Sequence, residues 1–190
     1  MKNKREKGQY GYRDHHKKIQ LAKIAFGAAM ILVQLLARNL TDNESAKNIL
    51  TVMAVLSVLP TANVASPLLA SWTYKTPSAD FYKQVSAQEE KGILLYDLIL
   101  TTKEQIIPGD AVLVHPHGVY IYCPSKKVDA VKAEKALNDI FAAHKLDRNV
   151  KVIKDESSFF KRLSTIKPMD RCEDDGSLSY AAGVLKSLSM

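Results

Sequence analysis

The stretch that decides the fold runs from Asn48 to Tyr74 and reads NILTVMAVLSVLPTANVASPLLASWTY. It contains no charged residue, and residues 49–70 alone are long enough to cross the hydrocarbon layer of a bilayer, which is about 30 Å thick. A helix of this composition has no polar face to present to water. Trp72 and Tyr74 follow in the position of an interfacial aromatic belt, and Lys75 ends the run. We therefore predict a membrane-spanning helix.

A second apolar segment lies upstream, at residues 24–37 (IAFGAAMILVQLLA), and the two residues before Lys23 extend it. The ammonium group of Lys23 can reach the lipid headgroups from the first helical turn. Between the two apolar segments lies the polar sequence NLTDNESAK, residues 39–47, which predicts a turn. Together they predict a transmembrane helical hairpin over residues 19–75. The alternatives are a buried hairpin in a soluble protein and a cleaved signal peptide for the first segment.

The charge distribution orients this hairpin. Residues 1–75 carry 11 Lys and Arg against 4 Asp and Glu, whereas residues 76–190 carry 16 of each. Seven of the basic residues lie in residues 1–18, which offer almost nothing apolar to bury and are expected to be flexible. The turn between the helices holds two, Arg38 and Lys47. The positive-inside rule therefore predicts a multi-pass protein of the cell membrane, with its N-terminus and C-terminal domain in the cytoplasm.

Polar and proline residues inside the second helix suggest that it packs against another helix. Pro60 and Pro67 each remove a backbone donor and favour a kink. Asn63 is costly in lipid and is expected to face the first helix or a partner. Small residues recur at every fourth position and allow close approach of helices. Helix packing is the favoured interpretation, because two helices enclose a pore only by oligomerising.

The C-terminal part predicts an α/β (α+β) domain over residues 78–190, with the order α-β-β-β-α-β-α. Ser78 is a candidate helix N-cap and Gly92 a helix stop. About 110 residues are enough to bury a modest core. The predicted elements are a helix at 79–91, a strand at 93–101, a turn at 107–110, a hairpin at 111–114 and 119–122, a helix at 128–146, a strand at 150–153, a helix capped by Asp155 and a last helix at 177–190.

The hairpin sequence from Asp110 to Tyr122, DAVLVHPHGVYIY, resembles the strand pair of the nuclease-related, restriction-endonuclease-like domain. That family has an Asp that opens one strand, a Pro-x-Gly turn, and a second strand that ends in Glu-x-Lys. The resemblance covers residues 78–153, and the predicted element order is also that of the family. The whole-chain pattern is similar to small uncharacterised two-helix membrane proteins of Gram-positive bacteria.

Carried over to this chain, the resemblance implies that Asp110 is the metal-binding aspartate. The position of the second carboxylate falls on Tyr122 or Cys123, and Lys126 or Lys127 stands near the position of the lysine. Metal-dependent hydrolysis needs carboxylates to hold the ion and a lysine to stabilise developing charge. Because one carboxylate is missing, the resemblance implies the fold and argues against activity.

His115 and His117 form an H-x-H pair, the weak start of a metal site. Pro116 and Gly118 place the pair in a turn, and no third ligand is evident, so turn residues are the favoured interpretation and no metal or cofactor is expected. The two cysteines lack metal-binding spacing. Nucleic-acid binding is not expected, because the domain is neutral.

Three functional hypotheses remain. The first is a non-enzymatic protein anchored in the lipid bilayer, whose cytosolic domain contacts a protein partner or a second copy of itself. The second is a divergent nuclease-like enzyme, which a second acidic residue close to Asp110 would favour. The third is a subunit of an oligomeric membrane assembly built on the second helix, which a polar stripe joined to Asn63 would favour.

Overall fold

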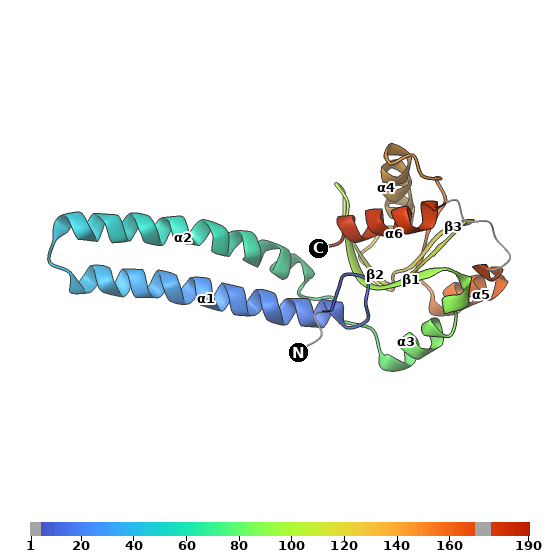
Figure 1. Ribbon diagram of the computed structural model, residues 1–190, viewed down its shortest axis with the longest axis horizontal. Helices are drawn as coiled ribbons and strands as arrows, with labels where there is room; N and C mark the ends of the chain where they lie inside the picture. Colours follow the sequence, from blue (N-terminus) through green and yellow to red (C-terminus); the bar gives the residue numbers. More distant parts are fainter. Residues whose placement is uncertain (1–4, 170–175) are drawn as a thin grey trace. The chain divides into compact units, whose positions relative to one another are not determined.

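The computed structural model describes residues 5–169 and 176–190. The chain divides into two compact units (Figure 1). One is the helical segment 14–74, and the other is an α/β domain formed by the residues up to Arg13 together with those from Lys75 onward. Residues 5–13 therefore belong to the domain, although the helical segment separates them from it in sequence. The domain boundary predicted at residue 78 misses this segment.

Two long helices make up the helical unit, α1 (Tyr12–Leu40) and α2 (Glu44–Ser71). Both are long and apolar enough to cross a membrane, and only 6% of the most apolar 18-residue stretch of each helix is buried. The Asn43 side chain caps α2 by accepting a hydrogen bond from the Ser45 amide at 2.9 Å. This cap makes the connection shorter than the turn predicted over residues 39–47.

The prediction that residues 1–18 are flexible is wrong for residues 12–18, which form the first turns of α1. Lys and Arg are good helix formers, so the helix extends beyond the apolar segment into the basic one. Residues 8–11 make hydrogen bonds to the domain through Gly8 and Gly11. The basic N-terminal flank is thus largely ordered structure.

The two helices contact each other through small and polar residues. Gly27 faces Thr61, and a Cβ at Gly27 would overlap the Thr61 side chain. Gln34 is buried and donates from Nε2 to Ser57 Oγ at 3.2 Å. Asn63, in contrast, is exposed, so the prediction that it faces the first helix is wrong. The alternative, that Asn63 faces a partner, stays a prediction.

The domain is an α/β (α+β) fold, as predicted. Its four-stranded sheet has the order β1-β2-β3-β4, with antiparallel pairing except between β3 and β4, which are parallel. The elements are α3 (Ala79–Ser86), η1 (Glu89–Lys91), β1 (Ile93–Thr101), β2 (Ile106–His115), β3 (Gly118–Tyr122), α4 (Ala130–Ala143), β4 (Val150–Ile153), α5 (Glu156–Thr165) and α6 (Ser177–Leu188).

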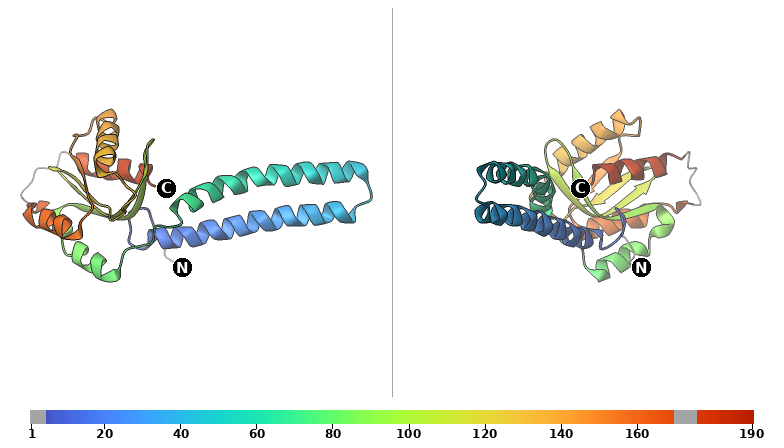
Figure 2. Two further views of the ribbon diagram at one scale, coloured as in Figure 1. Left: turned by 180° about the vertical axis from the view of Figure 1, so that it is seen from behind. Right: turned by 60° about the vertical axis from the view of Figure 1, so that its left-hand side comes forward.

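Helices cover both faces of the sheet, which explains why its strands read as nearly continuous apolar runs. Figures 1 and 2 show α4 and α6 on one face and α3 and α5 on the other. Leu137 of α4 and Leu185 of α6 belong to one buried cluster with Ile121 of β3. Phe81 of α3 and Phe159 of α5 belong to the other.

Strand β2 is longer than predicted, because residues 107–110 continue the strand instead of forming a turn. Pro108 pairs with Ile99 of β1. The other neighbour, β3, extends along β2 only as far as Ala111, which pairs with Tyr122. Pro108 therefore lies where β2 has a partner on one side only, which is where a strand tolerates a residue without an N–H.

Segments from both ends of the chain cover the outer edge of β1. The carbonyl of Gly8 accepts a hydrogen bond from the Tyr96 amide at 2.8 Å. Further along the strand, Leu100 forms a bridge with Ser189, and the Met190 amide donates to the Ile99 carbonyl at 3.1 Å. The backbone groups of this edge strand are thus partly paired, as edge strands generally require.

Candidate functional site

The register of β1 and β2 brings two aspartates to opposite positions on neighbouring strands. Tyr96 pairs with Ala111 and Leu98 with Gly109, so Asp97 lies across from Asp110. The backbone of Asp97 is left-handed, with φ at 56°, a conformation that aspartate tolerates better than most residues. The second carboxylate that sequence analysis sought near Asp110 is therefore present, but it comes from β1.

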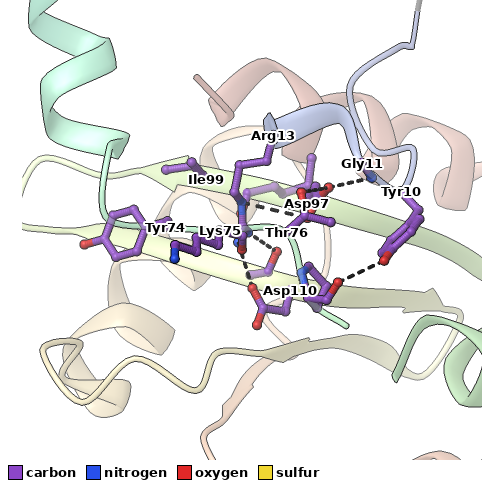
Figure 3. Close-up of polar contacts among 12 residues, drawn as sticks. Tyr10, Gly11, Arg13, Tyr74, Lys75, Thr76, Asp97, Ile99 and Asp110 are labelled. Atoms are coloured by element: carbon purple, nitrogen blue, oxygen red, sulfur yellow. Dashed lines mark hydrogen bonds and ion pairs between the residues drawn. The ribbon is translucent and has the colours of Figure 1, made fainter. Parts of the chain in front are cut away.

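The side chain of Arg13, at the start of α1, lies between the two aspartates (Figure 3). Arg13 is buried, with 3% of its surface exposed. Its Nη1 donates to Asp110 Oδ1 at 2.9 Å and to the Lys75 carbonyl at 2.6 Å. Its Nη2 donates to the carbonyls of Gly109 at 3.1 Å and Leu98 at 3.3 Å. The guanidinium is thus surrounded by acceptors from both strands and from the segment that follows α2.

Asp97 is 1% exposed. Its carboxylate is held by the two segments that flank the helical hairpin. Its Oδ2 accepts hydrogen bonds from the Gly11 amide at 2.7 Å and from Thr76 Oγ1 at 3.0 Å. Its Oδ1 lies 3.9 Å from Arg13 Nε. We call Arg13, Asp97 and Asp110 the ionic cluster.

Burial raises the pKa of both carboxyl groups in the ionic cluster. The positive charge of the Arg13 guanidinium lowers the pKa of both carboxyl groups and so opposes this rise. Its hydrogen bond to Asp110 also lowers the pKa of Asp110. The carboxylate of Asp97 adds to the rise at Asp110, because like charges that face each other disfavour ionisation. Arg13 is therefore the group that permits two carboxylates to be buried side by side.

Two converging carboxylates are what a metal-dependent hydrolase requires, but here a guanidinium fills the space between them. A divalent ion would need the carboxylate oxygens that already accept hydrogen bonds from Arg13, Gly11 and Thr76. Within residues 5–169 and 176–190, no three His, Cys, Asp or Glu residues come together as a metal site would need. The cluster holds chain segments together, and the Arg13 guanidinium lies where an ion shared by the two carboxylates would have to bind.

The other positions of the nuclease resemblance do not supply a carboxylate. Tyr122 ends β3 and packs in the core, with its ring centroid 5.1 Å from that of Phe81 and 5.4 Å from that of Phe159. Cys123 is buried, and burial raises the pKa of its thiol. Asp110, which also fitted a turn, lies within β2.

Arg13 was not predicted from the sequence as a functional residue, whereas Asp97 was a candidate for the missing carboxylate and carried a signal. It is the one charged residue in the apolar run ILLYDLILT of β1. A charge in a strand that is buried on both faces needs a partner of opposite charge. That argument predicts a buried basic partner, but it does not identify Arg13 among the basic residues of the chain.

His115 and His117 do lie together, at the turn between β2 and β3. His115 is 3% exposed, and its Nε2 is 3.2 Å from the Lys167 carbonyl. Its Nδ1 accepts a hydrogen bond from the His117 amide at 3.1 Å and lies 3.3 Å from His117 Nδ1. Both ring nitrogens of His115 therefore have partners within the chain, and no third metal ligand joins the pair in the described part of the chain.

The residues predicted at the membrane interface, Lys23, Trp72 and Tyr74, belong to the helical unit, and their place at an interface stays a prediction. Lys23 is exposed on α1, and Trp72 is the C-cap of α2 and 52% exposed. Lys17 donates from Nζ to the carbonyl of Trp72 at 3.0 Å and to that of Tyr74. Lys17 thereby supplies a donor to the carbonyls at the end of α2.

Comparison with known proteins gives no match. No protein-family model, no curated protein and no solved structure matches the chain.

Proposed function

We propose that the protein is anchored in a membrane by the hairpin of α1 and α2, and that its α/β domain is a non-enzymatic module for protein contacts at the membrane surface. The exposed apolar surface of the helical unit supports the anchor. Phe26, Leu59 and Leu69 are 70%, 64% and 72% exposed. An apolar surface that extends along two helices needs lipid or protein to cover it.

The ionic cluster supports a two-crossing topology. Residues 5–13 precede the hairpin and Lys75 and Thr76 follow it, yet all of them bind within one domain. This arrangement supports a topology in which both flanks of the hairpin lie on the same side of the membrane. The basic residues of the N-terminal flank favour the cytoplasmic side by the positive-inside rule.

A pair of reporter fusions tests this topology. A reporter that is active only in the cytoplasm should be active after Met190 and inactive when inserted at Asn43, in the loop between α1 and α2. Activity at Asn43 together with inactivity after Met190 would contradict the orientation. Activity at both positions would contradict the two crossings.

The ionic cluster also supports the non-enzymatic part of the proposal, since the Arg13 guanidinium lies between the two carboxylates that hydrolysis would need. Purified protein with magnesium or manganese is expected to leave DNA and RNA intact, and so is the Asp110→Ala variant. Cleavage by the native protein that is lost in Asp110→Ala would favour the nuclease-like alternative. The neutral charge of residues 76–190 also provides little attraction for a polyanion.

A second candidate function, an oligomeric membrane assembly, is favoured by Asn63. This residue is exposed on α2, in a helix that contains no charged residue after Lys47, and the described residues give its side chain no hydrogen-bond partner. An amide in lipid gains from a hydrogen bond to a second copy of α2. Cross-linking in membranes should then trap a dimer of the native protein and less of Asn63→Leu. Equal cross-linking of the two would argue against this contact.

A further inference from the structure

A hollow of about 190 Å³ lies between the turn that joins β2 to β3 and the end of α5. We call this hollow the Arg162 pocket. Its lining includes His115, His117, Tyr120, Arg162 and Lys167. The ionic cluster contributes no residue to it. Neither the membrane anchor nor the proposed contact function explains why basic side chains gather here.

The Arg162 guanidinium is held in a fixed position above a buried ring. Its Nη2 donates to Tyr120 Oη at 2.9 Å, and its Cζ lies 4.8 Å from the centroid of the Tyr120 ring. Tyr120 is 1% exposed, so the ring is a rigid platform. The cation–π contact and the hydrogen bond orient the guanidinium before any ligand arrives, which lowers the entropy cost of binding.

The positive charge in the Arg162 pocket is not compensated by the described residues. No carboxylate lies within ion-pair distance of Arg162 or Lys167 in residues 5–169 and 176–190. An arginine has five N–H donors, and Tyr120 takes one of those of Arg162. Within the described residues, the remaining donors of Arg162 have no hydrogen-bond acceptor and face an acceptor that enters the hollow. Two permanent positive charges also repel a metal ion, which argues further against a metal site at the histidines.

The histidine pair adds a third group to the pocket. The Lys167 carbonyl can only accept, so Nε2 of His115 carries the proton and Nδ1 is the acceptor for the His117 amide. His117 Nδ1 lies 3.3 Å from the same His115 Nδ1. The exposed ring of His117 therefore lies beside that of His115 at the hollow.

From this arrangement we infer that the Arg162 pocket binds the phosphate group of a phosphomonoester. Arg162 is the principal ligand, Lys167 contributes charge, and the His117 ring lines the same hollow. A phosphomonoester carries close to two negative charges at neutral pH, which match the two permanent cations better than a single carboxylate does. The inference does not depend on the membrane anchor.

Calorimetric titration of the full-length protein in lipid nanodiscs tests the inference, with glycerol phosphate as the probe. The native protein should bind it saturably. Arg162→Gln should weaken binding by about tenfold or more, because a charge-assisted hydrogen bond is lost. The matched control is Arg148→Gln, which removes the same charge from an exposed position outside the pocket and should change binding less than twofold.

Two nanodisc compositions distinguish a soluble ligand from a lipid headgroup. Equal binding of glycerol phosphate in discs of phosphatidylcholine and in discs with added phosphatidic acid supports a soluble phosphomonoester. Competition by phosphatidic acid supports the lipid headgroup as the source of the same phosphate group. Absence of saturable binding in both discs would overturn the inference, and so would equal weakening by Arg162→Gln and Arg148→Gln. Unchanged circular dichroism of both variants shows that they are folded.

Discussion

Arg13 and Arg162 have the same side chain, but the protein surrounds them in opposite ways. Arg13 is buried among two carboxylates and three backbone carbonyls. Arg162 is exposed, stacks on one tyrosine ring and has no carboxylate partner in the described residues. A buried, compensated charge stabilises the fold, whereas a fixed, uncompensated charge at a hollow is available to a ligand. The difference predicts which arginine controls stability and which controls binding.

The largest effect is expected from removing the segment that carries Arg13. A fragment of residues 78–190 lacks Arg13, Gly11 and Thr76, so it leaves Asp97 and Asp110 buried without their donors. We expect it to be less stable than the same fragment with residues 5–13 and 75–77 restored through a flexible linker, by at least the roughly 3–5 kcal/mol that breaking a buried ion pair costs. Urea denaturation measures the difference. Equal stability would show that residues 5–13 are not part of the domain in solution.

Single substitutions compare the two arginines directly. Arg13→Met removes the charge from the ionic cluster and leaves two facing carboxyl groups, so the free energy of unfolding should fall by about 3–5 kcal/mol. Arg162→Met changes an exposed side chain and should stay within about 0.5 kcal/mol of the native protein. Denaturant unfolding in detergent measures both. A larger loss in Arg162→Met than in Arg13→Met would reverse the assignment.

The effect of Arg13 should also depend on pH. Burial already raises the pKa of Asp97 and Asp110, and Arg13→Gln removes the group that opposes the rise. A carboxyl group with a raised pKa in the folded state contributes stability at low pH and loses it as pH increases through that pKa. Arg13→Gln should therefore destabilise the domain more at pH 7 than at pH 4, by about 1 kcal/mol or more, since one pKa unit equals about 1.4 kcal/mol. Equal destabilisation at both pH values would exclude the carboxyl groups as the cause.

A small effect on both stability and binding is expected at Tyr120. Tyr120→Phe keeps the buried ring under Arg162 but removes the hydroxyl that accepts its hydrogen bond. The free energy of unfolding should change by about 1 kcal/mol or less, as for a typical single hydrogen bond. Glycerol phosphate should bind a few times more weakly, because the guanidinium is less well oriented. Calorimetry on Tyr120→Phe and native protein measures this, and unchanged affinity would show that the hydroxyl does not position Arg162.

Local sequence patterns predicted the elements of the domain better than its contacts. Strands 93–101 and 150–153 were predicted with their observed bounds, because each is an apolar run between clear breaks. The N-caps Ser78 and Asp155 were also predicted, since capping depends on residues that are close in sequence. The extension of β2 through Pro108 was missed, because a Pro-Gly pair is usually a turn and only the length of β3 shows otherwise.

The ionic cluster was out of reach of such patterns. Arg13 and Asp97 are separated by the entire helical hairpin, and no local periodicity records a contact over that distance. The basic N-terminal flank was interpreted as flexible on its composition, which is a sound rule for segments without partners. Here the buried Asp97 and the partly buried Asp110 provide the partner. The Arg162 pocket was missed for the same reason, since α5 and the turn that carries the histidines meet only in the folded domain.

The distant position of Arg13 in the chain has a consequence for biosynthesis. The N-terminal segment leaves the ribosome before the hairpin and long before β1 and β2. Arg13 is therefore synthesised before its partners Asp97 and Asp110. If the hairpin inserted with its first flank on the wrong side of the membrane, Asp97 and Asp110 would be buried without their cation. Such a domain would be only marginally folded and would be removed by proteases. With the proposed membrane anchor, the ionic cluster would link completion of the domain to an insertion that leaves both flanks of the hairpin on one side of the membrane.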